Sequence, residues 1–167
     1  MLDCLQGLRD DMKVCKSSRH SKITGDFAES LVLYWLSKYG FESANVDHTG
    51  IDIIARNPKT KEIMGISVKS RCRNTGEEGT YIRIPKDNFS KIKKACKAFG
   101  CLPYFAIVVD EADSITVFIL KMEKLLKMFP IGKSTLGWKM NKKNIERYRS
   151  DPDIKIIEFS HETKKWW

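Results

Sequence analysis

Hydrophobic residues recur at helical spacing from residue 24 to residue 39. Two series run in four-residue steps, one through Phe27, Leu31 and Trp35 and the other through Ala28, Val32 and Leu36. Thr24 is suited to cap the start of this helix and Gly40 to end it. Because both series are apolar, we expect the helix to be buried on most sides. Glu29 is in phase with Leu33 and Leu36, where a carboxylate is costly.

A second helical stretch, residues 87–99, is amphipathic. Its apolar positions are Phe89, Ile92, Ala95, Cys96 and Phe99, and lysines occupy the opposite face. A short helix is expected at 122–128 and another within residues 1–20. Residues 130–150 are basic and only weakly periodic.

Apolar runs of strand length lie between the helices. They cover residues 41–46, 51–56, 63–70, 80–84, 103–109, 114–120 and 154–159. The order of elements is helix, three strands, helix, strand, strand. This order predicts an α/β fold in which helices flank a central mixed β-sheet.

The second and third strands are joined by the turn residues 57–61. If Asn57 pairs with Glu62, Asp52 faces Ser67 and Gly50 faces Lys69. Strand alternation then gathers a carboxylate, a hydroxyl and an ammonium on one face, beside a glycine that leaves room. The other face takes the apolar residues Ile51, Ile53, Ile66 and Val68.

These groups suit one kind of chemistry. A carboxylate such as Asp52 binds Mg²⁺, which keeps several waters and takes one or two protein carboxylates. The metal polarises a phosphoryl oxygen and activates a bound water, and an ammonium stabilises the charge that grows on phosphorus. Glu29, on the preceding helix, is a candidate second acid.

The composition of the chain indicates a polyanionic binding partner. The 167 residues include 30 Lys and Arg against 21 Asp and Glu, which gives a net charge of +9 and a pI of 9.3. The bases concentrate in residues 69–97 and 121–149. The length predicts one domain, residues 1–167, with a core at about 22–120 and a basic C-terminal extension at 130–167. We find no membrane span and no signal peptide, and the five cysteines are expected to be reduced, as in a cytoplasmic protein.

Residues 24–71 resemble the PD-(D/E)xK nuclease superfamily, and within it archaeal Holliday-junction resolvases and restriction-endonuclease-like proteins. The resemblance rests on Glu29 in the helix, on Asp47-His48-Thr49-Gly50-Ile51-Asp52 and on Ser67-Val68-Lys69-Ser70. It implies a restriction-endonuclease-like core and a structure-specific, metal-dependent DNA endonuclease. Mg²⁺ or Mn²⁺ is the implied cofactor, with no small-molecule cofactor, and DNA is the implied partner, with a homodimer as one possibility.

The resemblance also assigns residue roles. Glu29, Asp52, Ser67 and Lys69 match the catalytic positions, and Asp52, Glu29 and the Val68 carbonyl match the metal ligands. The family has Glu or Asp where this chain has Ser67, so Glu77, Glu78 and Glu29 are candidate substitutes. Seven bases that follow the catalytic strand are expected to contact DNA: Arg71, Arg73, Arg83, Lys86, Lys91, Lys93 and Lys94.

Other interpretations stay open. Ser67 admits an inactive nucleic-acid-binding module of the same fold, and charge alone also admits a restriction enzyme or an RNA-directed nuclease. Asp52, Lys69 and Glu29 each have an ordinary structural interpretation as strand or helix residues. Asp47 either binds turn amides or touches metal, and His48 is read as a loop residue. Residues 74–79 are a candidate flap, Cys96 and Cys101 a weak redox pair, and Trp138, Trp166 and Trp167 are read as packing residues.

Overall fold

The structure is a computed structural model that describes residues 16–73, 81–111 and 113–162. Its elements are α1 (His20–Lys38), β1 (Glu42–His48), β2 (Ile51–Arg56), β3 (Ile63–Cys72), β4 (Tyr81–Pro85), α2 (Lys86–Phe99), β5 (Leu102–Glu111), β6 (Ser114–Lys121), α3 (Met122–Met128), β7 (Thr135–Lys139), α4 (Lys142–Ser150) and β8 (Lys155–Ser160). The predicted order of helices and strands from the first helix to residue 128 is confirmed. None of the helices in the described ranges combines the length and the apolar character needed to cross a bilayer.

A six-stranded sheet in the order β1-β2-β3-β5-β6-β8 forms the centre of the molecule. Only the β3–β5 pair is parallel among its described pairs, so the sheet is mixed as predicted. Helix α2 supplies the crossover between these two strands. Strand β4, which the sequence did predict, pairs with β7 in a separate two-stranded sheet.

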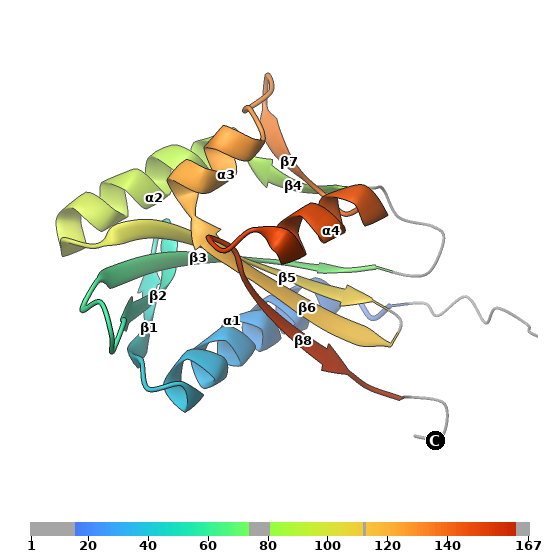
Figure 1. Ribbon diagram of the computed structural model, residues 1–167, viewed down its shortest axis with the longest axis horizontal. Coiled ribbons are helices and arrows are strands. Elements are labelled where there is room, and N and C mark those ends of the chain that lie inside the picture. Colours follow the sequence, from blue (N-terminus) through green and yellow to red (C-terminus); the bar gives the residue numbers. More distant parts are fainter. Residues whose placement is uncertain (1–15, 74–80, 112, 163–167) are drawn as a thin grey trace, which may run out of the picture.

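The central sheet separates two hydrophobic cores (Figure 1). Helix α1 covers one face and packs Ala28, Val32 and Leu36 against alternate residues of the strands. Helices α2 and α3 and the β4–β7 pair cover the other face. In β5, Phe105 and Ile107 point to the second core and Ala106 and Val108 to the first, as strand alternation requires.

The segment after Pro130 contributes three elements, two of which the sequence did not reveal. Strand β7 and helix α4 lie in the weakly periodic region, and β8 forms an edge of the central sheet. Trp138 of β7 and Tyr148 of α4 are fully buried and stack with ring centroids 4.0 Å apart. The prediction that Trp138 packs in the core is confirmed, while Trp166 and Trp167 lie outside the described residues.

Helix α1 differs from its prediction in two ways. It begins four residues earlier, so Thr24 is not its cap; instead the Thr24 hydroxyl donates to the His20 carbonyl inside the helix. It is also buried along only one stripe, because a single sheet covers it. Phe27 is 45% and Tyr34 55% exposed, so the expected burial on most sides was wrong. The short helix predicted in residues 1–20 falls mostly on residues that the structure does not describe.

The predicted hairpin register is confirmed. Ile53 pairs with Ile66 and Arg56 with Ile63, and the Asn57 N–H donates to the Glu62 carbonyl at 2.9 Å. The described ladder ends at Ile53, however, and β1 carries an irregularity between Asn45 and His48, where one extra residue lies opposite β2.

This irregularity changes which way β2 presents its side chains. Ile51 packs in the core beside α2, while Ile53 packs in the core beside α1. The prediction that both lie on one face was therefore wrong, because it assumed an uninterrupted strand. Similarly, Phe99 was predicted to face inward but is 45% exposed, with its ring 5.1 Å from His48.

The sequence predicted that Gly50 leaves room for a ligand. In the structure, the space beside Gly50 is instead filled by helix α2. A Cβ placed on Gly50 would lie 2.5 Å from the Lys91 carbonyl carbon, and its φ of +106° disfavours other residues. The turn between β1 and β2 therefore rests directly on the α2 backbone.

We predict that Gly50→Ala lowers the free energy of unfolding by at least about 2 kcal/mol, because it combines overpacking with an unfavourable φ. Urea denaturation measures this change. Gly25→Ala is the matched control, since a Cβ there meets nothing within 4 Å inside α1. We expect that control to be neutral or stabilising by up to about 1 kcal/mol. Equal stabilities of Gly50→Ala and the wild type would contradict the packing described here.

Candidate active site

The candidate site lies where β2 parts from β3. Beyond the last described pair of the ladder, the backbone N–H of Val68 donates to the Asp52 carboxylate at 2.6 Å. The Ser67 hydroxyl lies 3.4 Å from the same carboxylate oxygen and is only 3% exposed. The Asp52 side chain thus replaces the missing strand partner of Val68. Because a strand residue points its N–H and C=O to the same side, the Val68 carbonyl faces this opening as well.

Lys69 follows Val68 on β3. It is half-buried, and burial lowers the pKa of its ammonium, while the charges of Asp52 and Glu29 raise it. Lys91 and Asp87 of α2 also contribute to its electrostatic environment. Asp87, which forms an ion pair with Lys91 at 2.5 Å, was not among the predicted site residues. The sequence offered one hint of this ion pair: Asp87 lies four residues before Lys91, a spacing that places an acid and a base side by side on a helix.

Glu29 reaches the same place from α1. Burial and the neighbouring charge of Asp52, with a further contribution from Asp26, raise the pKa of the Glu29 carboxyl. Lys69 and Lys22 act in the opposite direction. The structure therefore brings Glu29, Asp52 and Lys69 within electrostatic range of one another, although they come from a helix and two strands.

The donors at this site suit a hard divalent cation. They are the carboxylates of Asp52 and Glu29 and the carbonyl of Val68, and Mg²⁺ takes one or two carboxylates while keeping several waters. Within the described residues no group of three or more His, Cys, Asp or Glu side chains could hold a metal. Ser67 does not add a charged ligand, since its buried hydroxyl is directed at Asp52. Glu77 and Glu78, the other candidate acids, lie outside the described residues, as does the predicted flap at 74–79.

The seven bases predicted to contact nucleic acid differ in their surroundings. Arg71 is exposed at the end of β3, and Lys86, Lys93 and Lys94 are exposed on α2. Arg73 is engaged with Glu111 at 2.7 Å and Lys91 with Asp87. Arg83 is exposed on β4, with its guanidinium over the ring of Tyr81. Arg71 and Arg73 thus lie at and just after the end of β3, four of the bases lie on α2, and Arg83 lies apart on the small sheet.

Four further residues singled out by the sequence are Asp47, His48, Cys96 and Cys101. Asp47 and His48 are exposed at the end of β1, where the His48 ring nitrogen Nδ1 lies 3.0 Å from the Thr49 carbonyl oxygen. Cys96 and Cys101 are free thiols buried over Gly65, where a Cβ would lie 2.6 Å from each sulfur. Burial, aided by Cys101, raises the pKa of Cys96 to about 12. A protonated, buried thiol of this kind is unreactive.

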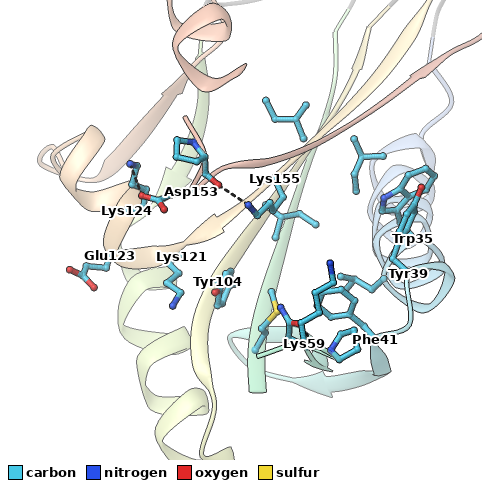
Figure 2. A pocket seen from close by; sticks show the side chains of 18 of the residues that line it. Trp35, Tyr39, Phe41, Lys59, Tyr104, Lys121, Glu123, Lys124, Asp153 and Lys155 are labelled. Carbon is cyan, nitrogen blue, oxygen red and sulfur yellow. Dashed lines mark hydrogen bonds and ion pairs between the residues drawn. The ribbon is translucent and has the colours of Figure 1, made fainter. Parts of the chain in front are cut away.

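A cavity of about 670 Å³, which we call the α1 cavity, lies at the opposite end of the sheet from Asp52. Figure 2 shows Trp35 and Tyr39 on one side of it and Lys121 and Lys124 on the other. Its lysines are largely neutralised. Lys121 pairs with Glu62, Lys124 with Asp151 and Asp153, and Lys127 with Glu123. The α1 cavity therefore offers no strong positive field, and it shares no residue with the candidate site.

No protein-family model matches this chain, and neither does any curated protein sequence. Among solved structures, the chain is similar to Hjc, a Holliday junction resolvase from the archaeal hyperthermophile Archaeoglobus fulgidus. The two chains are 19% identical and superpose with a TM-score of 0.52 over 69% of this chain and 88% of the other. The predicted resemblance in fold to archaeal Holliday-junction resolvases is thereby confirmed.

The raised pKa of Glu29 predicts a pH-dependent stability. A folded-state pKa above the unfolded value means that the folded protein binds the proton more tightly, so this contribution is largest at low pH and is lost as pH rises through the folded pKa. Glutamine does not titrate. We therefore expect the stability of Glu29→Gln, relative to the wild type, to increase between about pH 4 and pH 7 in calorimetric melts.

Glu123→Gln provides a control of opposite sign. The hydrogen bond and charge of Lys127 lower the pKa of Glu123, so removal of its carboxylate should cost relatively more stability as pH rises. If the stability of Glu29→Gln instead changes with pH in parallel with that of the wild type, burial and the charge of Asp52 do not raise the pKa of Glu29.

Proposed function

We propose that this protein is a nuclease that hydrolyses phosphodiester bonds in DNA with a divalent metal, Mg²⁺ or Mn²⁺, and that it acts on branched DNA. The observation that carries the proposal is the convergence of Glu29, Asp52 and Lys69 at the opening between β2 and β3. The fold of a Holliday junction resolvase supports this choice of reaction and substrate. The net charge of +9 supports a nucleic-acid partner.

Asp52, Glu29 and the Val68 carbonyl would hold the metal. A divalent ion bound there polarises the phosphoryl oxygen and lowers the pKa of a coordinated water. The hydrogen bonds from the Val68 N–H and the Ser67 hydroxyl fix the orientation of the Asp52 carboxylate in advance. In this role Ser67 positions Asp52 and is not itself a ligand.

Lys69 and Glu29 supply the remaining chemistry. The half-buried ammonium of Lys69 has little water around it, so it interacts strongly with the negative charge that develops on the phosphoryl oxygens. Glu29, as the second carboxylate, would also orient the attacking water. The exposed bases Lys86, Lys93 and Lys94 on α2 would hold the flanking phosphates.

A second candidate is a binding module of the same fold without catalysis. It is favoured by Ser67, because the third carboxylate that the resemblance implies is replaced here by a buried neutral hydroxyl. The nuclease and the binding module both predict DNA binding that weakens as the salt concentration rises, but only the nuclease predicts cleavage.

The proposal predicts that Asp52→Ala and Lys69→Ala each reduce DNA cleavage by about 10²-fold or more, because each removes a group that acts on the developing charge. The measurement is cleavage of labelled four-way junction, linear duplex, single strand and RNA with Mg²⁺ or Mn²⁺. We expect the four-way junction to be cut fastest.

Two exposed residues of the same types serve as controls, Asp113→Ala in the β5–β6 turn and Lys59→Ala in the β2–β3 turn. Both should cleave like the wild type. A folded wild-type protein that binds the junction but cuts nothing would establish the binding module instead. Preferential cutting of RNA would replace DNA as the substrate.

A further inference from the structure

The outer face of the β4–β7 pair, together with α4, forms a second basic surface. A hollow of about 950 Å³ lies there, which we call the hairpin hollow; it is lined by residues that include Tyr81, Gly137, Lys139, Lys143, Asn144 and Arg147. Figure 1 shows this part of the molecule beside the start of α2. None of the lining residues belongs to the candidate active site.

The cations of the hairpin hollow form no ion pairs within the described part of the chain, although Arg147 lies within electrostatic range of Asp151. No carboxylate lines it, and none of the ion pairs found among the described residues involves Lys139, Lys143 or Arg147. The neighbouring Arg83 likewise has no ion pair within that part of the chain. The α1 cavity is the reverse case, since most of its lysines are paired. Of these two hollows, this one therefore has the more strongly positive lining.

The hollow also presents an aromatic ring. Tyr81 lies across Gly137 of the adjacent strand, where a Cβ would lie 3.1 Å from the ring, and it faces Lys139 in the strand register. The guanidinium of Arg83 sits 5.4 Å from the ring centroid and donates to the Tyr81 hydroxyl at 3.2 Å. Tyr81 is nevertheless 44% exposed. Ring and guanidinium together offer a flat surface on which a nucleobase can stack.

The strands that carry this surface are anchored in the hydrophobic core by the side chains on their opposite face. Ile82 and Ile84 of β4 and Leu136 and Trp138 of β7 point the other way, into the core. The Tyr148 hydroxyl of α4 donates to the Lys139 carbonyl at 2.7 Å, which ties the helix to the strand. Lys143 and Arg147 are four residues apart on α4, so they occupy the same side of the helix.

We propose that the hairpin hollow binds single-stranded DNA, with a base stacked on Tyr81 and phosphates held by Lys139, Lys143 and Arg147. A duplex offers phosphates but no accessible base faces, so the exposed ring beside cations of a hollow that no carboxylate lines favours an unpaired strand. The inference relies on the proposed function only for the choice of DNA over RNA.

The test is binding of a fluorescein-labelled single strand, followed by fluorescence anisotropy over a range of salt concentrations in EDTA. The double variant Lys143→Gln/Arg147→Gln should bind about tenfold more weakly, and its log K against log salt slope should be shallower by about 1.4, the value for two lost phosphate contacts on a single strand. Tyr81→Ala should also weaken binding by about tenfold, with an unchanged slope, while Tyr81→Phe retains affinity.

The matched control is Lys59→Gln/Lys155→Gln, which removes the same charge from exposed lysines of the α1 cavity. Thermal melts verify that every variant is folded. The inference is overturned if the control loses as much affinity as the α4 double variant, if the α4 double variant weakens binding of the matching duplex as much as binding of the single strand, or if an RNA strand of the same sequence binds more tightly. Because no divalent metal is present, these outcomes are independent of whether the protein cleaves DNA.

Discussion

The hydrogen bond between the Val68 N–H and the Asp52 carboxylate is the contact on which the candidate site depends. A backbone donor in the middle of a sheet normally finds a strand partner, and here a side chain takes that place. The contact lets β2 leave β3 without an unpaired donor, and it holds a carboxylate at the opening so created. The extra residue in β1 and the close contact of Gly50 with α2 lie just before Asp52 in the chain.

The two cores explain how distant parts of the chain reach this opening. Helix α1 packs on one face and brings Glu29, while α2 packs on the other and brings Asp87 and Lys91. The strands between them contribute Asp52 and Lys69. Charges from four elements therefore interact in a partly buried space, where each changes the proton affinity of its neighbours more than it would in water.

The C-terminal elements extend the molecule in a different manner. Trp138, Tyr148, Phe118 and Phe129 form a buried aromatic cluster that fastens β7 and α4 to the central sheet. With their apolar sides committed to this cluster, β4, β7 and α4 present their polar sides outward, and the basic residues of the hairpin hollow lie on that surface. The same packing that stabilises the segment thus determines which of its cations are displayed.

The sequence by itself determined most elements and the hairpin register, because apolar periodicity and turn chemistry act over short distances. It also named Glu29, Asp52 and Lys69 as candidate site residues. Only the tertiary structure decided that α1 is buried along one stripe, that Ile51 and Ile53 point to opposite cores, and that Gly50 admits a helix and not a ligand. The place of β7 and α4 was likewise hidden, since their burial comes from aromatic residues too few to form a periodic pattern. Each of these features depends on which surface of the fold covers a residue, and that is settled by contacts between segments far apart in the chain.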